Sequence, residues 1–365
     1  MPMYIPKLND LTDKQWEVQD LPLAGRYLIT GGPGSGKTSI ALRRTEAIKK
    51  ESPNSRVGSF LFTNALNDFF SDGISELGIR TGVKVWAKWQ MAFLRQHGRT
   101  WPQGERVPWR ELSDFILEYE VQQEFDHLII DEAQDFNDSD LKVMNLLAEN
   151  ISVFADRNQT IRMAVAGDDR IEKLKSVLSI DEDDTHELLE NHRNTKQIMS
   201  AAQYIAPEEV AYDEIVRSGP KPRLWSYTSS EKQVEALCRV ITANKQRDVA
   251  ILHFRNDRIR ELHEAVSSKL NGSVPLQLVR SDRFDFTNHS AKFCTLDSAK
   301  GLEFDVVIMP WMSQEDYWVS LSNQTRLYVG MTRPRLELFL LYPHANPSEY
   351  LFRIPRENLD TRDLG

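Results

Sequence analysis

Short apolar runs, rich in β-branched and aromatic residues, alternate with amphipathic segments along most of this chain. Runs of the first kind predict buried strands, and segments with a period of 3.6 residues predict helices. The expected strands cover residues 26–30, 57–62, 127–130, 152–155, 223–227, 249–253, 293–296 and 306–309. The expected helices include 110–121, 140–149, 195–205, 231–243 and 256–269. This alternation predicts an α/β fold with parallel sheets flanked by helices.

The alternation is interrupted at residues 206–222, where Pro207, Gly219, Pro220 and Pro222 cluster among few apolar positions. A second series of strands and helices begins at residue 223. With 365 residues, the chain is long enough to bury two ordinary cores. We therefore expect a first domain over 1–205, a linker over 206–222, a second domain over 223–346 and a tail over 347–365.

Composition limits the partners. The chain has 45 basic and 54 acidic residues, a net charge of −9 and an isoelectric point near 5.5. Any contact with a polyanion must therefore use a local basic groove and should be sensitive to salt. Cys238 and Cys294 provide neither a disulfide framework nor a zinc spacing. No signal peptide or membrane span is visible, so we expect a cytoplasmic protein without a membrane partner.

Residues 31–38 read Gly-Gly-Pro-Gly-Ser-Gly-Lys-Thr, between an expected strand and an expected helix. This is the setting of a phosphate-binding loop, whose glycines allow the backbone amides to approach a phosphate. Lys37 would reach the β- and γ-phosphates of ATP, and the Thr38 hydroxyl would bind Mg²⁺. The expected nucleotide ligands are Gly31, Gly32, Gly34, Ser35, Gly36, Lys37 and Thr38.

A second candidate site follows the strand at 127–130, where the chain reads Asp-Glu-Ala-Gln-Asp over 131–135. Asp131 can hold Mg²⁺ opposite Thr38, and Glu132 can polarise the water that attacks the γ-phosphate. An acidic pair after a strand is also a common helix cap. About ninety residues after a phosphate-binding loop, the catalytic interpretation is favoured.

These motifs resemble those of the UvrD/Rep/PcrA-type superfamily 1 DNA helicases, and the resemblance continues in the family's order along nearly the whole chain. It implies two RecA-like P-loop NTPase domains with an ATP cleft between them. Residues 11–15 resemble the motif that reads adenine, which implies that role for Gln15. Residues 154–159 resemble the motif whose glutamine, here Gln159, senses the γ-phosphate.

The resemblance extends to three motifs further along the chain. Residues 189–195 and 326–333 resemble the segments that carry arginine fingers, which would be Arg193 and Arg333. Residues 298–304 resemble the motif whose glutamate, here Glu303, faces the nucleotide. His192 stands where the family has an adenine-stacking tyrosine. Hydrolysis would then require the two domains to close together, as in a motor.

Nucleic-acid contacts are less well marked. Residues 61–64 resemble a motif that touches the phosphates of a single strand, which assigns Phe62, Thr63 and Asn64 to DNA. Base-stacking aromatics of the family are replaced by Thr-Ile-Arg at 160–162. Trp86 and Trp89 are candidate replacements for base stacking, and Lys88 between them is a candidate for pairing with a phosphate. Alternatively, Trp86 and Trp89 belong to the core face of a helix.

The segments 90–125 and 255–292 leave little room for the family's inserted subdomains. We therefore expect an ATP- and Mg²⁺-dependent translocase or 3′–5′ helicase whose turnover is stimulated by single-stranded DNA. It would act in DNA repair or antiviral defence with a partner such as a nuclease. The alternative is an ATP-gated switch that docks a partner protein without unwinding DNA. A third hypothesis is an RNA-directed member of the superfamily.

Overall fold

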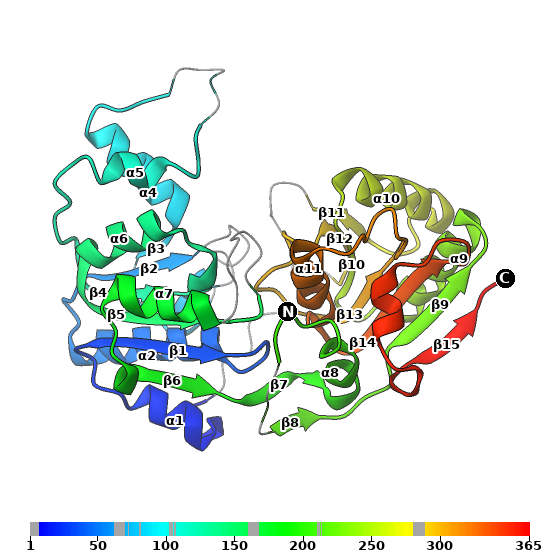
Figure 1. Cartoon of the computed structure of the whole chain (residues 1–365), viewed down its shortest axis with the longest axis horizontal. Helices are drawn as coiled ribbons and strands as arrows, with labels where there is room; N and C mark the ends of the chain where they lie inside the picture. Colours follow the sequence, from blue (N-terminus) through cyan, green and yellow to red (C-terminus); the bar gives the residue numbers. More distant parts are fainter. Residues whose placement is uncertain are drawn as a thin grey trace. The chain divides into compact units, whose positions relative to one another are not determined.

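The computed structural model describes residues 7–61, 70–71, 73–79, 82–101, 105, 107–159, 168–209, 212, 214–279 and 289–365. The chain divides into two compact units (Figure 1). We call Pro2–Leu188 the N-terminal unit and Leu189–Gly365 the C-terminal unit. Among the helices that the structure describes, none combines the length and apolar character that crossing a bilayer requires.

The N-terminal unit is built on a six-stranded sheet with the order β3-β2-β4-β5-β1-β6. All neighbouring strands are parallel. The strands are β1 (Arg26–Gly31), β2 (Val57–Leu61), β3 (Gly82–Val85), β4 (Phe125–Ile130), β5 (Ala148–Ala155) and β6 (Thr185–Leu188). Because the strands are parallel, the carboxyl ends of β4, β5 and β1 lie side by side at one edge of the sheet.

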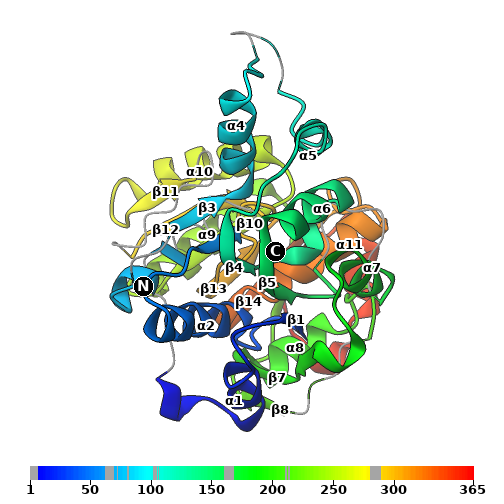
Figure 2. The ribbon, with the colours of Figure 1, turned by 90° about the vertical axis from the view of Figure 1, so that its left-hand side faces the viewer.

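Helices cover both faces of this sheet (Figure 2). Successive strand residues point to opposite faces, so Leu28 and Ile29 enter different cores. The Ile29 core includes residues of α1 (Asp13–Gln19) and α2 (Lys37–Glu51). The Leu28 core includes residues of α4 (Trp86–Gln96), α5 (Leu112–Ile116), α6 (Asp138–Leu147) and α7 (Asp168–Leu178). Burial on both faces explains the continuous apolar runs at the carboxyl ends of β4 and β5, residues 128–130 and 153–155.

A buried arginine fixes the segment that leads into β1. Arg44 of α2 is fully buried. Its guanidinium donates to the carbonyls of Val18 at 3.0 Å and Pro22 at 3.1 Å, and to the hydroxyl of Ser152 at 3.2 Å. These bonds satisfy a charge that would be costly to bury alone.

The C-terminal unit contains a seven-stranded sheet with the order β11-β12-β10-β13-β14-β9-β15, again with parallel neighbours. The strands are β9 (Arg223–Tyr227), β10 (Val249–His253), β11 (Leu276–Leu278), β12 (Ala291–Thr295), β13 (Phe304–Met309), β14 (Pro334–Pro343) and β15 (Asp360–Asp363). One face packs against α9 (Ser230–Ala243) and α10 (Asn256–Leu270). α8 (Lys196–Ala202) and α11 (Leu321–Met331) also contact the sheet, and Gly330 allows α11 to approach Met309 closely.

The boundary between the units differs from the predicted one. Residues 189–205 were expected in the first domain, but β7 (Glu190–Thr195) and α8 pack in the C-terminal unit. β7 pairs in parallel with β8 (Glu214–Arg217), inside the segment expected to be a linker. The buried Asn194 amide donates to the carbonyls of Thr332 at 3.0 Å and Pro334 at 2.7 Å. These bonds attach β7 to the C-terminal sheet.

The residues expected to form a tail are also part of the C-terminal unit. They include the short 3₁₀ helices η4 (Glu349–Arg353) and η5 (Arg356–Asn358) and the edge strand β15. β15 pairs with β9, with Asp360 opposite Arg223. Four residues are too few to show a periodic pattern in the sequence, so β15 could not be predicted. Its pairing with β9 is what makes it a strand.

Most expected elements have counterparts, and the fold class is confirmed. β9 and β10 run over the residues predicted for them. The helix predicted over 110–121 is wrong in length, since α5 ends at Ile116. The chain leaves the helix so that Tyr119 packs against Phe93 and His97, with ring centroids 6.2 Å and 4.8 Å away. Tertiary packing has overridden local helix propensity there.

The buried His253, at the end of β10, generates a prediction about acid stability. Its Nδ1 accepts the Arg255 N–H at 3.1 Å, and burial lowers the pKa of the imidazole to about 4. An unfolded histidine titrates near pH 6.5, so between about pH 6.5 and 4 only the unfolded chain takes up this proton. Stability therefore falls as the pH falls through that window, by on the order of 3 kcal/mol in total.

His253→Asn keeps an acceptor for the Arg255 N–H but does not titrate. We expect the free energy of unfolding, measured in urea at pH 7, 6 and 5, to fall less steeply in the variant than in the wild type. Equal slopes for the two proteins would show that His253 does not take part in acid unfolding.

Candidate nucleotide-binding site

The loop at 31–36 joins β1 to α2 and has the backbone that its glycines predict. Gly34 and Gly36 have φ values of 78° and 91°, in the left-handed region that favours glycine. A Cβ on Gly31 would lie 2.6 Å from the Ser35 Oγ and 2.8 Å from the Leu188 carbonyl. The loop therefore tolerates no side chain at Gly31 without moving.

Gln15 lies against this loop. It occupies the third position of α1 in a capping box with Thr12. Its amide nitrogen donates to the Ser35 carbonyl at 3.1 Å and would be 2.6 Å from a Cβ on Gly36. The structure thus brings Gln15 to the phosphate-binding loop, while its contact with adenine stays a prediction.

Lys37 and Thr38 begin α2 with their polar atoms turned to the loop and to β4. The Lys37 ammonium donates to the carbonyls of Gly31 at 2.7 Å and Gly32 at 2.9 Å. The Thr38 hydroxyl donates to Asp131 Oδ2 at 2.8 Å. The buried Ser35 Oγ has no hydrogen-bond partner among the described residues. A buried hydroxyl without a partner, in the same loop whose carbonyls hold the Lys37 ammonium, suits a site for an anion.

The acidic pair stands at the end of β4. Burial, followed by the charge of Glu132, raises the pKa of Asp131 to about 6, although the Thr38 hydroxyl and Lys37 oppose the shift. Glu132 has φ 54° and ψ 40°, a left-handed conformation that is unusual for this residue type. Strain of this kind is common where a side chain must be held in a functional position.

A hydrogen-bonded network joins the ends of β4 and β5. The Gln134 amide donates to Glu132, and its oxygen accepts the backbone N–H of Asp156 at 3.0 Å. The Gln159 amide donates to Asp156 Oδ2 at 2.7 Å, and Lys37 lies 3.6 Å from the same oxygen. Sequence reasoning missed Gln134 and Asp156. The signals for them were the position of Gln134 inside the acidic motif and that of Asp156 directly after β5.

The residues fit a magnesium nucleotide. Mg²⁺ takes oxygen ligands, keeps several waters and needs only one or two protein groups, here Thr38 and Asp131. The part of the chain that the structure describes has no group of three or more His, Cys, Asp or Glu that could hold a metal by itself. The donors of the loop match the charge of a triphosphate.

The C-terminal unit has a second charged centre, the arginine cluster, which consists of Arg193, Arg217, Arg333 and Arg335 around Glu303. The Arg193 Nε donates to Glu303 Oε2 at 2.8 Å, and Arg335 lies 3.5 Å from Glu303 Oε1. Burial by itself would raise the pKa of Glu303, but the charges of Arg193 and Arg335 hold it below its usual range. Arg217 donates to the Arg193 carbonyl at 3.1 Å.

Arg333 is buried in the same unit and contributes to the low pKa of Glu303. Its guanidinium donates to the carbonyls of Val329 at 2.9 Å and Leu302 at 3.2 Å. The cluster therefore contains both predicted arginine fingers, one carboxylate and two further arginines that sequence reasoning missed. His192, on β7, contacts Glu190 Oε2 at 3.1 Å through its Nε2, and its stacking on adenine stays a prediction.

Of the predicted nucleic-acid contacts, several lie outside the described residues and one is wrong. Phe62, Thr63, Asn64 and the segment 160–162 lie outside the described residues. Trp86 is only 4% exposed and stacks on Trp89 with ring centroids 4.9 Å apart. Its indole N–H donates to Asp140 at 2.8 Å. The assignment of Trp86 to base stacking is therefore wrong, because the ring already fills the core behind β2. Lys88 is exposed, and its contact with a phosphate stays a prediction.

The loop after β1, the acidic end of β4 and the parallel strand order place the N-terminal unit in the class of P-loop NTPases. A family model described as an AAA domain matches residues 18–165. A second model, described as the UvrD-like helicase C-terminal domain, matches residues 280–345. The chain is therefore a homologue of the UvrD/PcrA-type helicases, which confirms the predicted relationship.

Two individual relatives agree with this. The chain is similar to the ATP-dependent DNA helicase PcrA of Staphylococcus aureus, with 28% identity over 207 residues, which is 49% of this chain and 25% of that protein. The PcrA of Leuconostoc citreum is 26% identical over 191 residues, or 47% of this chain and 24% of the relative. The chain spans about a quarter of the length of these helicases.

Among solved structures, the C-terminal domain of a possible DNA helicase from Lactobacillus plantarum WCFS1 aligns with 22% identity and a TM-score of 0.39. The alignment covers 47% of this chain and 98% of that domain.

Gly31→Ala tests the geometry of the loop. Because the new Cβ would lie 2.6 Å from Ser35 Oγ and 2.8 Å from a backbone carbonyl, the loop must shift. We expect the affinity for a fluorescent ATP analogue to fall at least about tenfold, or ~1.4 kcal/mol. Gly272→Ala is the control, because a Cβ there meets nothing within 4 Å, and any loss of stability would come from its φ of 77° and not from a clash at the nucleotide site. That control should bind the analogue as the wild type does, and unchanged binding by Gly31→Ala would contradict the geometry.

Proposed function

We propose that this chain hydrolyses ATP with Mg²⁺ and uses the turnover to move along single-stranded DNA. The observation that carries the proposal is the network at the ends of β1, β4 and β5. There Lys37, Thr38, Asp131 and Glu132 are held by one another and by the loop. The names of the relatives support the DNA substrate, since both PcrA proteins are described as ATP-dependent DNA helicases.

The chemistry follows from atoms already in place. When ATP binds, the Lys37 ammonium gives up its hydrogen bonds to the Gly31 and Gly32 carbonyls and binds the β- and γ-phosphates instead. Thr38 and Asp131 would hold Mg²⁺, which would supply positive charge to offset the charge that develops on the phosphate oxygens. Glu132 orients the attacking water and accepts its proton, while Gln134 fixes the Glu132 carboxylate.

We assign Arg193 to the γ-phosphate during hydrolysis. To reach it, the guanidinium must leave Glu303, which retains Arg335 as a counter-ion at 3.5 Å. The exchange therefore leaves no carboxylate unpaired. Arg333 is the second candidate finger, and it would have to give up its bonds to the Val329 and Leu302 carbonyls.

The direction of movement, the DNA contacts and the biological role are proposed from the resemblance to the same helicases. We propose 3′–5′ movement, contact of Phe62, Thr63 and Asn64 with the DNA strand, and work with a nuclease in repair or phage defence. An ATP-gated switch that docks a partner protein without moving on DNA is the second candidate. The burial of Trp86 favours it, because losing a stacking residue weakens the grip on bases by about 1–3 kcal/mol.

Two substitutions and one substrate separate these functions. Lys37→Ala should abolish hydrolysis and weaken ATP binding. Glu132→Gln should keep ATP bound while turnover stops, because only the water-orienting group is lost.

In the wild type, oligo-dT should raise the rate of phosphate release several-fold at low salt, and the stimulation should disappear at high salt.

Hydrolysis without stimulation by DNA at any salt concentration would favour the switch over the motor. Normal turnover by Glu132→Gln would remove Glu132 from the catalytic role.

Arg193→Gln tests the arginine assignment. Since arginine fingers contribute about 10³–10⁵ in rate, we expect kcat to fall by at least about 10³ with little change in ATP affinity. Arg353→Gln is a matched control on η4, where the guanidinium stacks on Tyr350 at 4.8 Å. Single-turnover phosphate release should be normal in the control. A rate near that of the wild type in Arg193→Gln would exclude it as a finger.

A further inference from the structure

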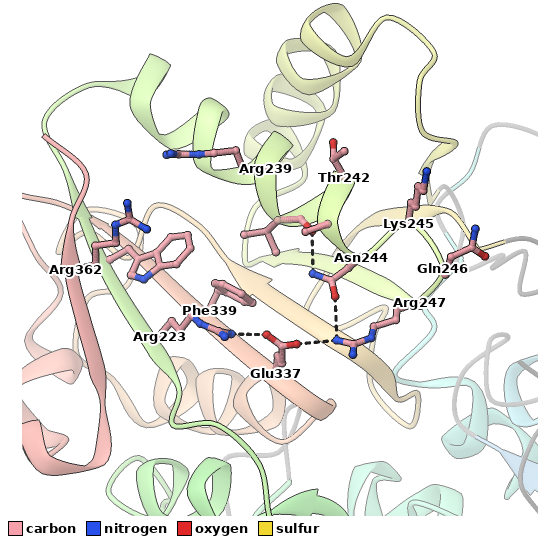
Figure 3. A pocket seen from close by; sticks show the side chains of 13 residues that line it. Arg223, Arg239, Thr242, Asn244, Lys245, Gln246, Arg247, Glu337, Phe339 and Arg362 are labelled. Carbon is pink, nitrogen blue, oxygen red and sulfur yellow. Dashed lines mark hydrogen bonds and ion pairs between the residues drawn. The ribbon is translucent and has the colours of Figure 1, made fainter.

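The C-terminal unit contains a pocket of about 620 Å³ that shares no residue with the phosphate-binding loop or the arginine cluster (Figure 3). It is formed by the end of α9, by the segment 244–247 that follows, and by β9, β14 and β15. Arg223 is the first residue of β9, and α9 ends at Ala243. We call this the basic pocket.

The lining is strongly positive. Five of its residues are cationic and one is acidic, in a chain whose net charge is −9. The cations are Arg223, Arg239, Lys245, Arg247 and Arg362. The single carboxylate, Glu337, is bonded to Arg223 and to Arg247, the latter at 2.7 Å. Among the described residues, no carboxylate lies within ion-pair distance of Arg239, Lys245 or Arg362, although the charge of Glu235, one turn earlier on α9, acts on Arg239.

Aromatic rings and hydrogen bonds hold several of these guanidiniums in place. Arg223 lies over the Phe339 ring at 4.7 Å, and Arg362 lies over the Trp225 ring at 5.8 Å. Arg247 also donates to the Asn244 side chain at 3.0 Å. Figure 3 shows Arg239 and Arg362 on one side of the pocket and Lys245 on the other. Arg223, Arg247 and Arg362 are thus held in place before any ligand binds.

We propose that the basic pocket binds a phosphate-rich anion, in which several phosphates lie close together. Three cations that form no ion pair among the described residues line one pocket, so the ligand must carry several negative charges in a short length. Linked phosphates meet that demand, whereas acidic side chains carry one charge each on separate stems. Guanidinium groups also match phosphate oxygens in a bidentate geometry. The source of the phosphates is a free polyphosphate, a nucleotide or the backbone of a nucleic acid.

The test uses inorganic tripolyphosphate and the full chain in a Lys37→Ala background, which weakens binding at the phosphate-binding loop. The pocket variant adds Arg239→Gln and Arg362→Gln. The matched control adds Lys232→Gln and Arg260→Gln, two exposed positions of α9 and α10 that remove the same charge outside the pocket. Calorimetric titration measures the affinity of each protein, and its thermal unfolding shows that each is folded.

We expect the pocket variant to bind tripolyphosphate at least about tenfold more weakly than the control, which should match its parent. Equal affinity in both variants, or no binding by the parent, would overturn the proposal. Tighter binding of poly-glutamate than of tripolyphosphate would also overturn it, in favour of an acidic protein segment.

A second arm identifies the source of the phosphates. Fluorescence anisotropy with a labelled single-stranded oligonucleotide is measured for the same variants. A parallel loss of DNA affinity in the pocket variant would support the proposal with a nucleic-acid backbone as the ligand. Loss for tripolyphosphate alone would support it with a small polyphosphate or a nucleotide. Because neither readout needs ATP turnover, failure here is distinct from failure of the proposed ATPase.

Discussion

The hydrogen bond from the Thr38 hydroxyl to Asp131 depends on one constraint, the order of parallel strands in the N-terminal sheet. Thr38 follows β1 and Asp131 follows β4, and β5 lies between these strands. Since all three strands run in the same direction, their carboxyl ends lie at one edge. Asp156, directly after β5, then lies within 3.6 Å of Lys37. A different strand order would separate the phosphate-binding loop from its carboxylates.

The charged groups of the C-terminal unit follow a different principle. Glu303 and Glu337 each hold two arginines, so each centre has more positive than negative charge. A surplus of this kind is costly to maintain in a folded protein unless an anion offsets it. In an acidic chain, such local surpluses are the places where phosphate chemistry is expected. The arginine cluster and the basic pocket are both surpluses of this type.

Much of the N-terminal site could be predicted from sequence because its groups fall within two short motifs. The glycines, Lys37 and Thr38 lie within eight residues, and Asp131 and Glu132 are adjacent. Gln134 and Asp156 were missed because their importance comes from bonds between the ends of neighbouring strands. The arginine cluster was predicted only in part, since Arg217 and Arg335 carry no motif and reach the cluster through the fold.

The sequence by itself determined the alternation of strands and helices, the phosphate-binding loop and the relationship to UvrD/PcrA-type helicases, because periodicity and short motifs are local properties. Only the tertiary structure decided that Trp86 belongs to the core, because its burial depends on Trp89 and Asp140. It also decided that residues 189–205 belong with the second sheet, through Asn194, and that β15 completes that sheet. These outcomes depend on contacts between residues far apart in the chain, which no local pattern records.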